Sequence, residues 1–138
     1  MLQKIYLISL KKIARFAINQ LHLDRRAEEY VYVVGLTTKT QALGVFEISH
    51  GAVSASICNP REIFIRLLLC GASTFVMIHN HPSGDTNPSK ADRMVAQKLK
   101  EAGDLLGITM IDSIIIGDHY HLSMKENSNA KLLNRMSI

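Results

Sequence analysis

The sequence predicts a three-layer α/β domain in which helices flank a mixed β-sheet. Apolar runs of strand length alternate with segments of helical periodicity, in the order helix, strands, helix, strand, helix, strands. The 138 residues, 47% of them hydrophobic, are enough for one such domain with a full core and no disulfide support. No internal repeat or low-complexity segment interrupts this order.

The first part of the chain predicts one helix and a hairpin. Apolar residues recur at helical spacing over residues 10–21, with basic and polar residues between them, so we expect this amphipathic helix to pack on the sheet. The β-branched and aromatic run at 30–36 is too apolar for an edge strand and predicts a central one. A polar turn at 37–41 leads to a second strand at 42–49, and a shorter strand is expected at about 55–58.

A capping pattern predicts the second helix. Asn59 and Glu62 stand three residues apart with Pro60 between them, the arrangement of an N-cap, a first-position proline and a capping partner. The helix is expected to run over residues 60–70 and to end at Gly71.

A buried strand at 73–78 should follow, and after it a loop at 82–88. Ser89 and Asp92 form a second capping pair at the start of a helix that Gly107 ends. Residues 108–116 and 120–124 predict a final pair of strands, and no strand is predicted beyond them.

The charge balance permits contact with nucleic acid but does not require it. Sixteen Lys and Arg residues against twelve Asp and Glu give a net charge of +4 and a pI near 9.2. The basic residues are scattered, and no aromatic platform alternates with them as a single-strand binder would need. We interpret them as a solvated basic surface.

The cysteines and the hydropathy predict a cytoplasmic protein that does not bind a membrane. Cys58 and Cys70 lack the CxxC pairing of a thiolate zinc site and are interpreted as buried core residues in a reducing compartment. Every apolar stretch is far shorter than the roughly 20 residues that cross a bilayer. The apolar run at 5–10 precedes Lys11 and Lys12, which inverts the order of a secretory signal.

His79 and His81 stand where the buried strand ends and carry the strongest chemical signal. Side chains two residues apart in an extended segment point to the same face, so both imidazoles can bind one ion. The following loop is long enough to fold back, so Asp92 can add a carboxylate oxygen as a third ligand. This set leaves a fourth position open for water, as in catalytic zinc sites. A glutamate should accept the proton of that water, and the candidates are Glu29 and Glu47.

The string at residues 79–92, HNHPSGDTNPSKAD, closely resembles the JAMM motif in the form carried by RadC-like proteins. The resemblance covers about residues 28–126 and includes NPRE at 59–62, EAG at 101–103, LGI at 106–108 and IIGD at 115–118, which look like the RadC version of the JAB/MPN domain. It implies a zinc-dependent metallopeptidase-type site on a cytidine-deaminase-like α/β fold.

The resemblance also implies roles by position. His79, His81 and Asp92 match the metal ligands, and Ser89 matches the serine that helps to hold the tetrahedral intermediate. Glu29 is the preferred base because it stands just before the strand expected beside the ligand-bearing one. Glu47 is the reserve, since strand register is not fixed by one sequence.

Three segments are expected: an N-terminal amphipathic helical segment at 1–27 that packs on the domain, the RadC-like JAB/MPN domain at 28–126, and a C-terminal tail at 127–138. RadC-like proteins usually carry a helix-hairpin-helix region before this domain. Only about 27 residues precede Glu28, so we expect that DNA-binding attachment to be missing.

Simpler interpretations accompany several of these residues. A second HxH pair, His119 and His121, has no Ser and Asp at helix-start spacing behind it and is predicted not to bind metal. Ser89 could act only as a helix cap. Asn80, Ser83 and Asp85 are interpreted as residues that orient the loop.

The leading hypothesis is a zinc-dependent hydrolase that cleaves an amide or isopeptide bond in a peptide or protein. The second is a non-catalytic module that binds DNA or protein and has a structural or vestigial metal site. Base deamination ranks last, because the H-x-E and P-C-x-x-C pattern of such enzymes is missing. The sequence leaves the substrate and the oligomeric state open.

Overall fold

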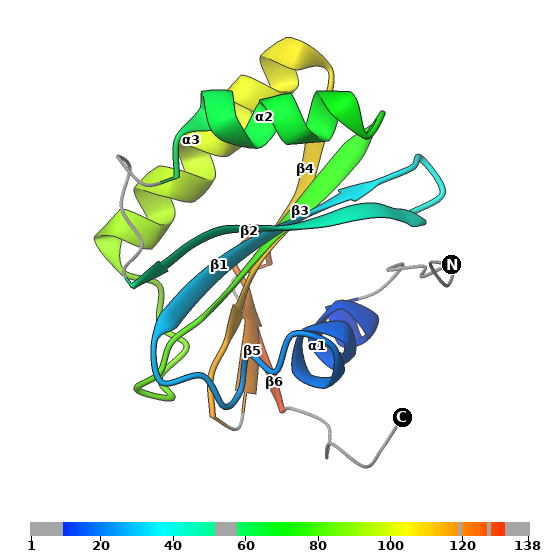
Figure 1. Cartoon of the computed structure of the whole chain (residues 1–138). Coiled ribbons are helices and arrows are strands. Elements are labelled where there is room, and N and C mark those ends of the chain that lie inside the picture. Colours follow the sequence, from blue (N-terminus) through cyan, green and yellow to red (C-terminus); the bar gives the residue numbers. More distant parts are fainter. Residues whose placement is uncertain (1–9, 52–57, 119, 127, 132–138) are drawn as a thin grey trace.

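The computed structural model of the 138-residue chain describes residues 10–51, 58–118, 120–126 and 128–131. Within them, three helices and six strands follow one another along the chain (Figure 1). They are α1 (Leu10–Asn19), β1 (Glu29–Leu36), β2 (Ala42–Gly51), α2 (Pro60–Leu69), β3 (Thr74–Asn80), α3 (Lys90–Leu106), β4 (Thr109–Ile116), β5 (Tyr120–Ser123) and β6 (Ser128–Lys131). No helix in the described ranges is both long and apolar enough to cross a membrane.

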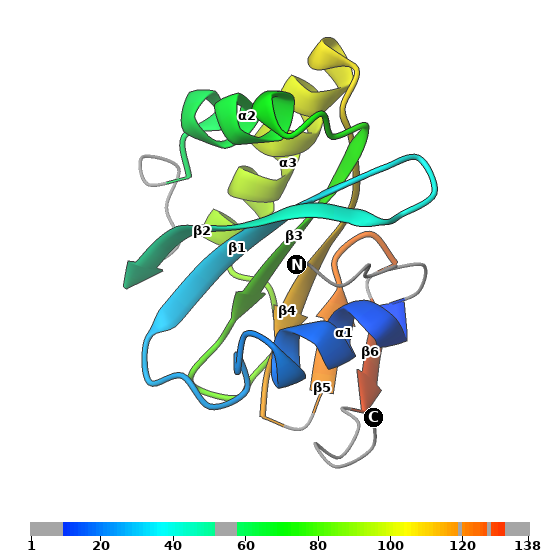
Figure 2. The ribbon, with the colours of Figure 1, turned by 45° about the vertical axis from the view of Figure 1, so that its right-hand side comes forward.

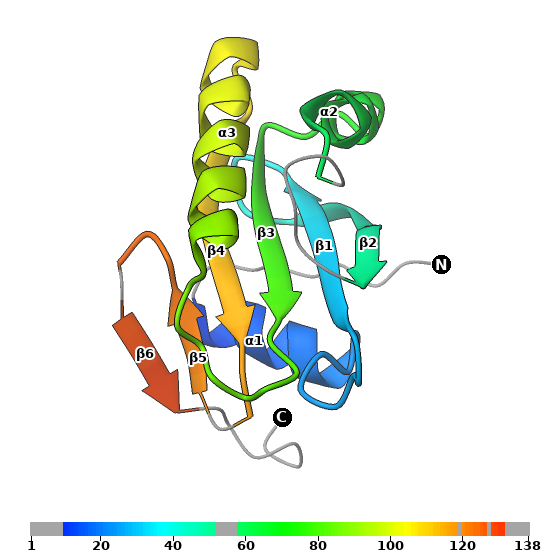
Figure 3. The ribbon, with the colours of Figure 1, turned by 90° about the vertical axis from the view of Figure 1, so that its left-hand side faces the viewer.

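The strands form a single mixed sheet in the order β2-β1-β3-β4-β5-β6. Only β3 and β4 pair in parallel, and the other neighbours are antiparallel. Parallel neighbours need a crossover connection, and α3 supplies it between β3 and β4. The chain therefore passes from the C-terminal end of β3 through a loop to the N-terminus of α3 (Figure 3).

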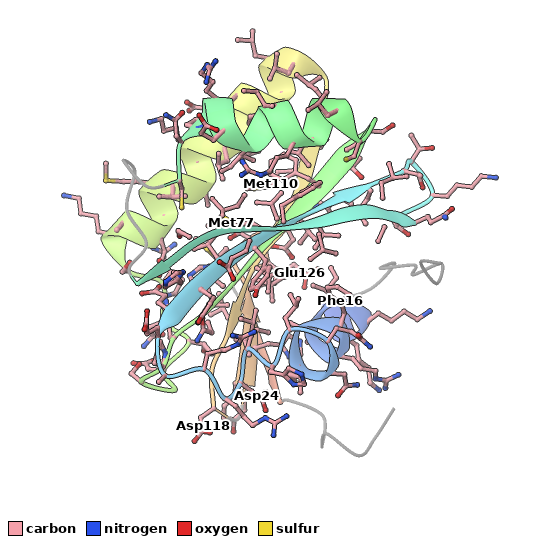
Figure 4. The ribbon with its side chains drawn as sticks, in the orientation of Figure 1. Phe16, Asp24, Met77, Met110, Asp118 and Glu126 are labelled. Atoms are coloured by element: carbon pink, nitrogen blue, oxygen red, sulfur yellow. The ribbon has the colours of Figure 1, made fainter. Side chains whose placement is uncertain are left out.

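Helices cover both faces of the sheet, as the three-layer prediction requires (Figures 1 and 2). On one face, α1 buries Ile13, Phe16 and Ala17 against residues such as Val34 and Ile78. On the other, α2 and α3 pack on a second cluster that includes Ile63, Leu99, Phe75 and Met77. Phe16 lies on the opposite side of the sheet from Met77 and Met110 (Figure 4). The α/β fold is that expected of a JAB/MPN domain.

The local signals for the hairpin and for the helix ends are confirmed, except that the carboxylate of Glu62, the expected capping partner at α2, accepts from the side chain of Arg61 instead. β1 and β2 pair as an antiparallel hairpin, and the side chain of Asn59 caps α2 by accepting a hydrogen bond from the backbone N–H of Arg61. Gly107 ends α3 in the left-handed conformation, with φ of 76°. The predicted N-terminal helix packs on the sheet but ends at Asn19, before the expected residue 21.

The end of the chain departs from the sequence-based expectation. Residues 128–131, expected to belong to a tail, form β6 and pair with β5 at the edge of the sheet. Ser128–Lys131 is short and carries no alternation of apolar and polar residues, so pairing with β5 determines this strand rather than any local pattern. The strand expected at 55–58 lies outside the described residues except for Cys58, which is a buried bend.

Candidate metal centre

Three segments that are distant in the sequence meet where β3 ends. His79 is in β3, His81 follows it, Glu29 is the first residue of β1, and Asp92 is in the first turn of α3. In the antiparallel pairing of β1 and β3, Val31 stands opposite His79. Glu29 lies two residues before Val31, and His81 lies two residues after His79. Because the strands are antiparallel, Glu29 is therefore placed beside His81.

The four side chains come close enough to share one ion. One ligand atom from each of Glu29, His79, His81 and Asp92 lies within 4.8 Å of all the others. The two oxygens of Asp92 divide between the histidines: Oδ2 is 2.9 Å from Nε2 of His81, and Oδ1 is 3.3 Å from Nε2 of His79. Oε1 of Glu29 lies 3.8 Å from Nε2 of His81.

Hydrogen bonds outside this group orient two of its members. Nδ1 of His81 lies 2.7 Å from the carbonyl oxygen of Asp85. Because that oxygen only accepts, Nδ1 carries the proton in the neutral ring, and Nε2 presents its lone pair to the group. The backbone N–H of Ser89 donates to Oδ2 of Asp92 at 2.8 Å, and Oγ of Ser89 accepts from the backbone N–H of Asp92 at 3.0 Å. This reciprocal capping box fixes the carboxylate on α3.

The electrostatics of the site favour an ionised carboxylate between the imidazoles. Burial of Asp92 favours its neutral form, but the hydrogen bond with His81 and the nearby imidazole of His79 outweigh burial and hold the pKa of Asp92 well below its ordinary value. For His81, burial disfavours the charged form, while hydrogen bonds with Asp92 and with the carbonyl of Asp85 outweigh it and raise the pKa of His81. A negative centre is thereby formed between two imidazole nitrogens.

The surroundings of the His79 ring show whether these residues fit a metal ion. Its side chain is fully buried, and neither ring nitrogen has a hydrogen-bond partner within the described part of the chain. Nε2 nevertheless faces Asp92 at 3.3 Å. A buried polar atom without a partner is costly, and a cation bound beside the two carboxylates would provide that partner. Two imidazoles with Asp and Glu are ligands that divalent transition metals accept, so the group can hold a metal ion.

The turn between β4 and β5 holds the loop that carries His81. The backbone N–H of His81 donates to the carbonyl of Ile116 at 2.9 Å, and that of Asp118 donates to the carbonyl of Gly84 at 3.2 Å. The approach is so close that a Cβ on Gly117 would lie 2.4 Å from the carbonyl oxygen of Gly84. Only glycine leaves room for the loop at this point.

Comparisons with known proteins show the family to which this fold belongs. The RadC-like JAB domain family matches residues 7–129 of the chain. The chain belongs to this family. A UPF0758 protein of Alkaliphilus metalliredigens is 44% identical over 101 residues, which cover 73% of this chain and 44% of that protein. One from Methanosarcina mazei is 43% identical over 108 residues, covering 78% of this chain and 47% of that protein. The chain thus spans less than half the length of these relatives.

Of the two glutamates considered in the sequence, this RadC-like domain brings Glu29 to the group and not Glu47. Glu47 pairs in register with Tyr32, whose hydroxyl donates to Oε1 of Glu47 at 3.3 Å. Tyr32 belongs to the cluster on the α1 face, whereas Val31 belongs to the cluster beneath α2 and α3. Burial and the charge of Glu47 raise the pKa of Tyr32. Glu47 therefore contacts the opposite face of the sheet.

Of the other residues considered for the site, Ser89 lies beside the group of metal-ligating side chains, and His121 lies outside it. Ser89 is exposed at the N-cap of α3, next to Asp92. His121 is buried in β5 and is outside the group of metal-ligating side chains, while its predicted companion His119 lies outside the described residues.

Asn80, expected to orient the loop, instead bonds the backbone at the start of β1, and a polar cavity that no sequence pattern indicated lies beside His81. Oδ1 of Asn80 accepts from the backbone N–H of Tyr30 at 2.6 Å, and its Nδ2 donates to the carbonyl of Glu28 at 2.9 Å, so Asn80 clamps the backbone on both sides of Glu29. A cavity of about 200 Å³ beside His81 is lined by Asp24, Arg26 and Asp118, among others. The position of Asn80 between the two histidines is a sequence signal that could have indicated a role at the site. The cavity has no such signal, because its lining comes from three segments that only the fold brings together.

Proposed function

We propose that this chain is a zinc-dependent hydrolase that cleaves an amide or isopeptide bond in a peptide or protein in the cytoplasm. The observation that supports the proposal is the convergence of two imidazoles and two carboxylates within 4.8 Å. A reducing compartment fits Cys58 and Cys70, which are thiols and form no disulfide.

His79, His81 and Asp92 are the residues that would hold zinc. Two imidazoles and one carboxylate are the protein ligands of several catalytic zinc sites, which leave one position for water or substrate. Bound zinc would supply a Lewis acid and lower the pKa of a bound water toward neutrality. The carbonyl of Asp85 and the capping box at Ser89 hold His81 and Asp92 in the required orientation.

Glu29 is the residue proposed to move the proton. Its side chain is 22% exposed, and its Oε1 lies 3.8 Å from Nε2 of His81. The carboxylate therefore lies beside the metal ligands and is still open to solvent. Oε1 would accept a proton from the attacking water and return it to the nitrogen of the leaving amine. The clamp by Asn80 keeps the backbone of Glu29 in place during both transfers.

Ser89 is proposed to donate a hydrogen bond to the substrate. Its Oγ accepts from the backbone N–H of Asp92, which leaves the hydroxyl proton available to a second partner. Because Ser89 is exposed beside Asp92, that partner can be the oxygen of the scissile carbonyl as it gains negative charge. Replacement by Asn keeps a capping oxygen, so Ser89→Asn should remain folded and lose turnover.

Two charge-neutralising variants test the proposal. Glu29→Gln should bind zinc and lose turnover, because an amide does not accept the proton, while Glu47→Gln should keep both. Glu47 is the matched control, since it loses the same charge on the other face of the sheet. Zinc is measured in the purified proteins by elemental analysis, and turnover on a library of peptides and isopeptides.

The same experiment separates hydrolysis from a binding function. Failure of the zinc-loaded wild-type chain to cleave any member of the library would contradict the proposal. Salt-sensitive DNA binding that His81→Ala leaves unchanged would then favour a non-catalytic module.

A further inference from the structure

A second cavity, of about 240 Å³, lies between α3 and the first half of β4. Arg93 from α3, Met110 and Ser113 from β4, and Met124 and Lys125 from the turn after β5 are among the residues that line it. Met110 is labelled in Figure 4, on the side of the sheet that α2 and α3 cover.

The cavity lies beside an irregular start of β4. Phe75 pairs with Met110 and the next residue of β3 pairs with Asp112, so β4 carries one extra residue at this point. β5 pairs only with Ile114–Ile116, and the preceding part of β4 is therefore not covered by β5. Ser113 pairs with Met77, two residues or roughly 7 Å along β3 from His79. The cavity is thus separate from the candidate metal centre.

Ser113, one of the residues that line this cavity, carries a buried hydroxyl. The residue is only 3% exposed, and its Oγ has no hydrogen-bond partner among the residues described. Its backbone is fully used, since its N–H donates to Oδ1 of Asp112 and its carbonyl accepts from the N–H of Met124. Buried hydroxyls are normally hydrogen-bonded, so a polar group bound there would satisfy this one.

The charges that line the cavity indicate the sign of that group. Arg93 and Lys125 are exposed, and within the described ranges neither side chain forms an ion pair. The one carboxylate among the lining residues, Asp112, already accepts from three donors: the backbone N–H groups of Ser113 and Lys125 and the hydroxyl of Ser123. Two cations and one occupied carboxylate leave one net positive charge for a ligand to neutralise.

We propose that this cavity binds a carboxylate joined to a short apolar group. Arg93 and Lys125 contact the carboxylate, the hydroxyl of Ser113 donates to it, and Met110 and Met124 pack against the apolar part. A volume of about 240 Å³ is below the range of pockets for drug-sized ligands, which favours a ligand about the size of one residue. Such a carboxylate belongs either to a small free acid or to the C-terminal residue of a polypeptide.

Titration of the full chain with isocaproate tests the proposal. Backbone amide signals in two-dimensional NMR should shift saturably at Ser113, Lys125 and the first half of α3. Arg93→Gln and Lys125→Gln should each weaken binding by about tenfold, the effect of one lost charge-assisted hydrogen bond. Ser113→Ala should also weaken it, with unchanged circular dichroism as the check on folding. Lys98→Gln is the matched control, since Lys98 lies on α3 outside this cavity.

Two comparisons decide the outcome. Isocaproamide has the same shape without the charge, and binding as tight as that of isocaproate would overturn the proposal. Equal weakening by Lys98→Gln and Arg93→Gln would also overturn it, because only the overall charge would then matter. A peptide that ends in leucine, with a free or amidated C-terminus, identifies the source: tighter binding of the free peptide than of isocaproate indicates a polypeptide C-terminus, and the reverse a small acid. All these measurements use Glu29→Gln as well, so they are independent of hydrolysis.

Discussion

Two His-x-His pairs occur in this chain, and the fold gives their imidazole rings different surroundings. His79 and His81 stand where β3 ends, with Asp92 and Glu29 around them. His121 of the second pair lies in β5, 3% exposed, and neither of its ring nitrogens has a hydrogen-bond partner in the described part of the chain. The first pair can share an ion, whereas the described member of the second pair is a neutral group in the core.

The difference comes from what surrounds each ring. Hydrogen bonds with Asp92 and with the carbonyl of Asp85 outweigh burial and raise the pKa of His81. Burial alone lowers the pKa of His121. Identical spacing in the sequence therefore has no fixed chemical meaning, because the carboxylates that let the first pair share a metal ion come from other elements.

The largest effect on zinc affinity is expected from removing the charge of Asp92, the carboxylate that lies beside the first histidine pair. Asp92→Asn should lower zinc affinity at least about 100-fold, since a direct ligand should matter no less than the residues that support ligands. Asp85→Asn is the control, because Asp85 contacts His81 through its backbone carbonyl. Zinc affinity is measured by competition with a chelator. Equal affinities of wild-type and Asp92→Asn proteins would remove Asp92 from the ligand set.

Asp92 also predicts the response of the zinc-free protein to acid. Its pKa is lowered in the folded state, so its contribution to stability is complete above the ordinary value of about 3.9 and is lost as the pH falls through the folded-state value. The loss below about pH 4 should be smaller in Asp92→Asn.

A smaller effect on stability and zinc binding is expected at Gly117, where the turn before β5 contacts the loop that carries His81. Gly117 lies in the turn that leads to β5 and His121, and it also contacts the loop that carries His81. Gly117→Ala would place a Cβ 2.4 Å from the carbonyl oxygen of Gly84, so the loop must move. We expect a loss of about 1–3 kcal/mol in the free energy of unfolding, together with weaker zinc binding.

Gly71→Ala is the control for this change. Gly71 has φ of 75° and no neighbour within 4 Å of an added Cβ, so the substitution introduces backbone strain of about 1 kcal/mol without touching the loop. Zinc affinity should stay unchanged in Gly71→Ala. If both variants bind zinc as the wild type does, the turn does not position His81.

His121 should destabilise the fold in mild acid. Because its pKa is below 6.5 when folded, the unfolded chain binds the proton more readily, and stability falls as the pH decreases from 6.5 toward the folded-state pKa. The slope is at most about 1.4 kcal/mol per pH unit. His121→Phe should remove it, measured by urea unfolding of the zinc-free protein between about pH 5 and 7.

The pH dependence of His81 runs in the opposite sense, because its raised pKa gives stability at low pH that is lost as the pH rises. The difference between wild-type and His121→Phe proteins isolates His121. His22→Asn, which replaces an exposed histidine outside both pairs, is the control variant. A slope that His121→Phe leaves intact would assign it to other groups.

Local patterns predicted the parts of the site that depend on local structure. The HxH pair at a strand end and the Ser-x-x-Asp pair at a helix start each fix a side chain through the geometry of its own element, and the structure brings these elements together. The choice between Glu29 and Glu47 depended on strand register. The pairing of β1 with β2 shifts between Val31 and Tyr32, and one residue of shift moves a side chain to the other face.

Non-local pairing also explains what the sequence did not predict. β6 pairs with the edge of β5, and the cavity at Ser113 lies beside the bulge in β4, before the residues that pair with β5. Neither feature leaves a periodic pattern in its own residues, so each needs the assembled sheet.

The smallest effect is expected at the cap of α3. Ser89→Ala removes the acceptor for the backbone N–H of Asp92 and should cost about 1 kcal/mol in thermal unfolding. Zinc affinity should fall far less than in Asp92→Asn, because the backbone N–H of residue 89 still donates to Oδ2 of Asp92 at 2.8 Å. Ser89→Asn restores a capping oxygen and should regain the stability. A loss of zinc in Ser89→Ala as large as in Asp92→Asn would mean that the cap, and not only the charge of Asp92, is needed to bind the metal.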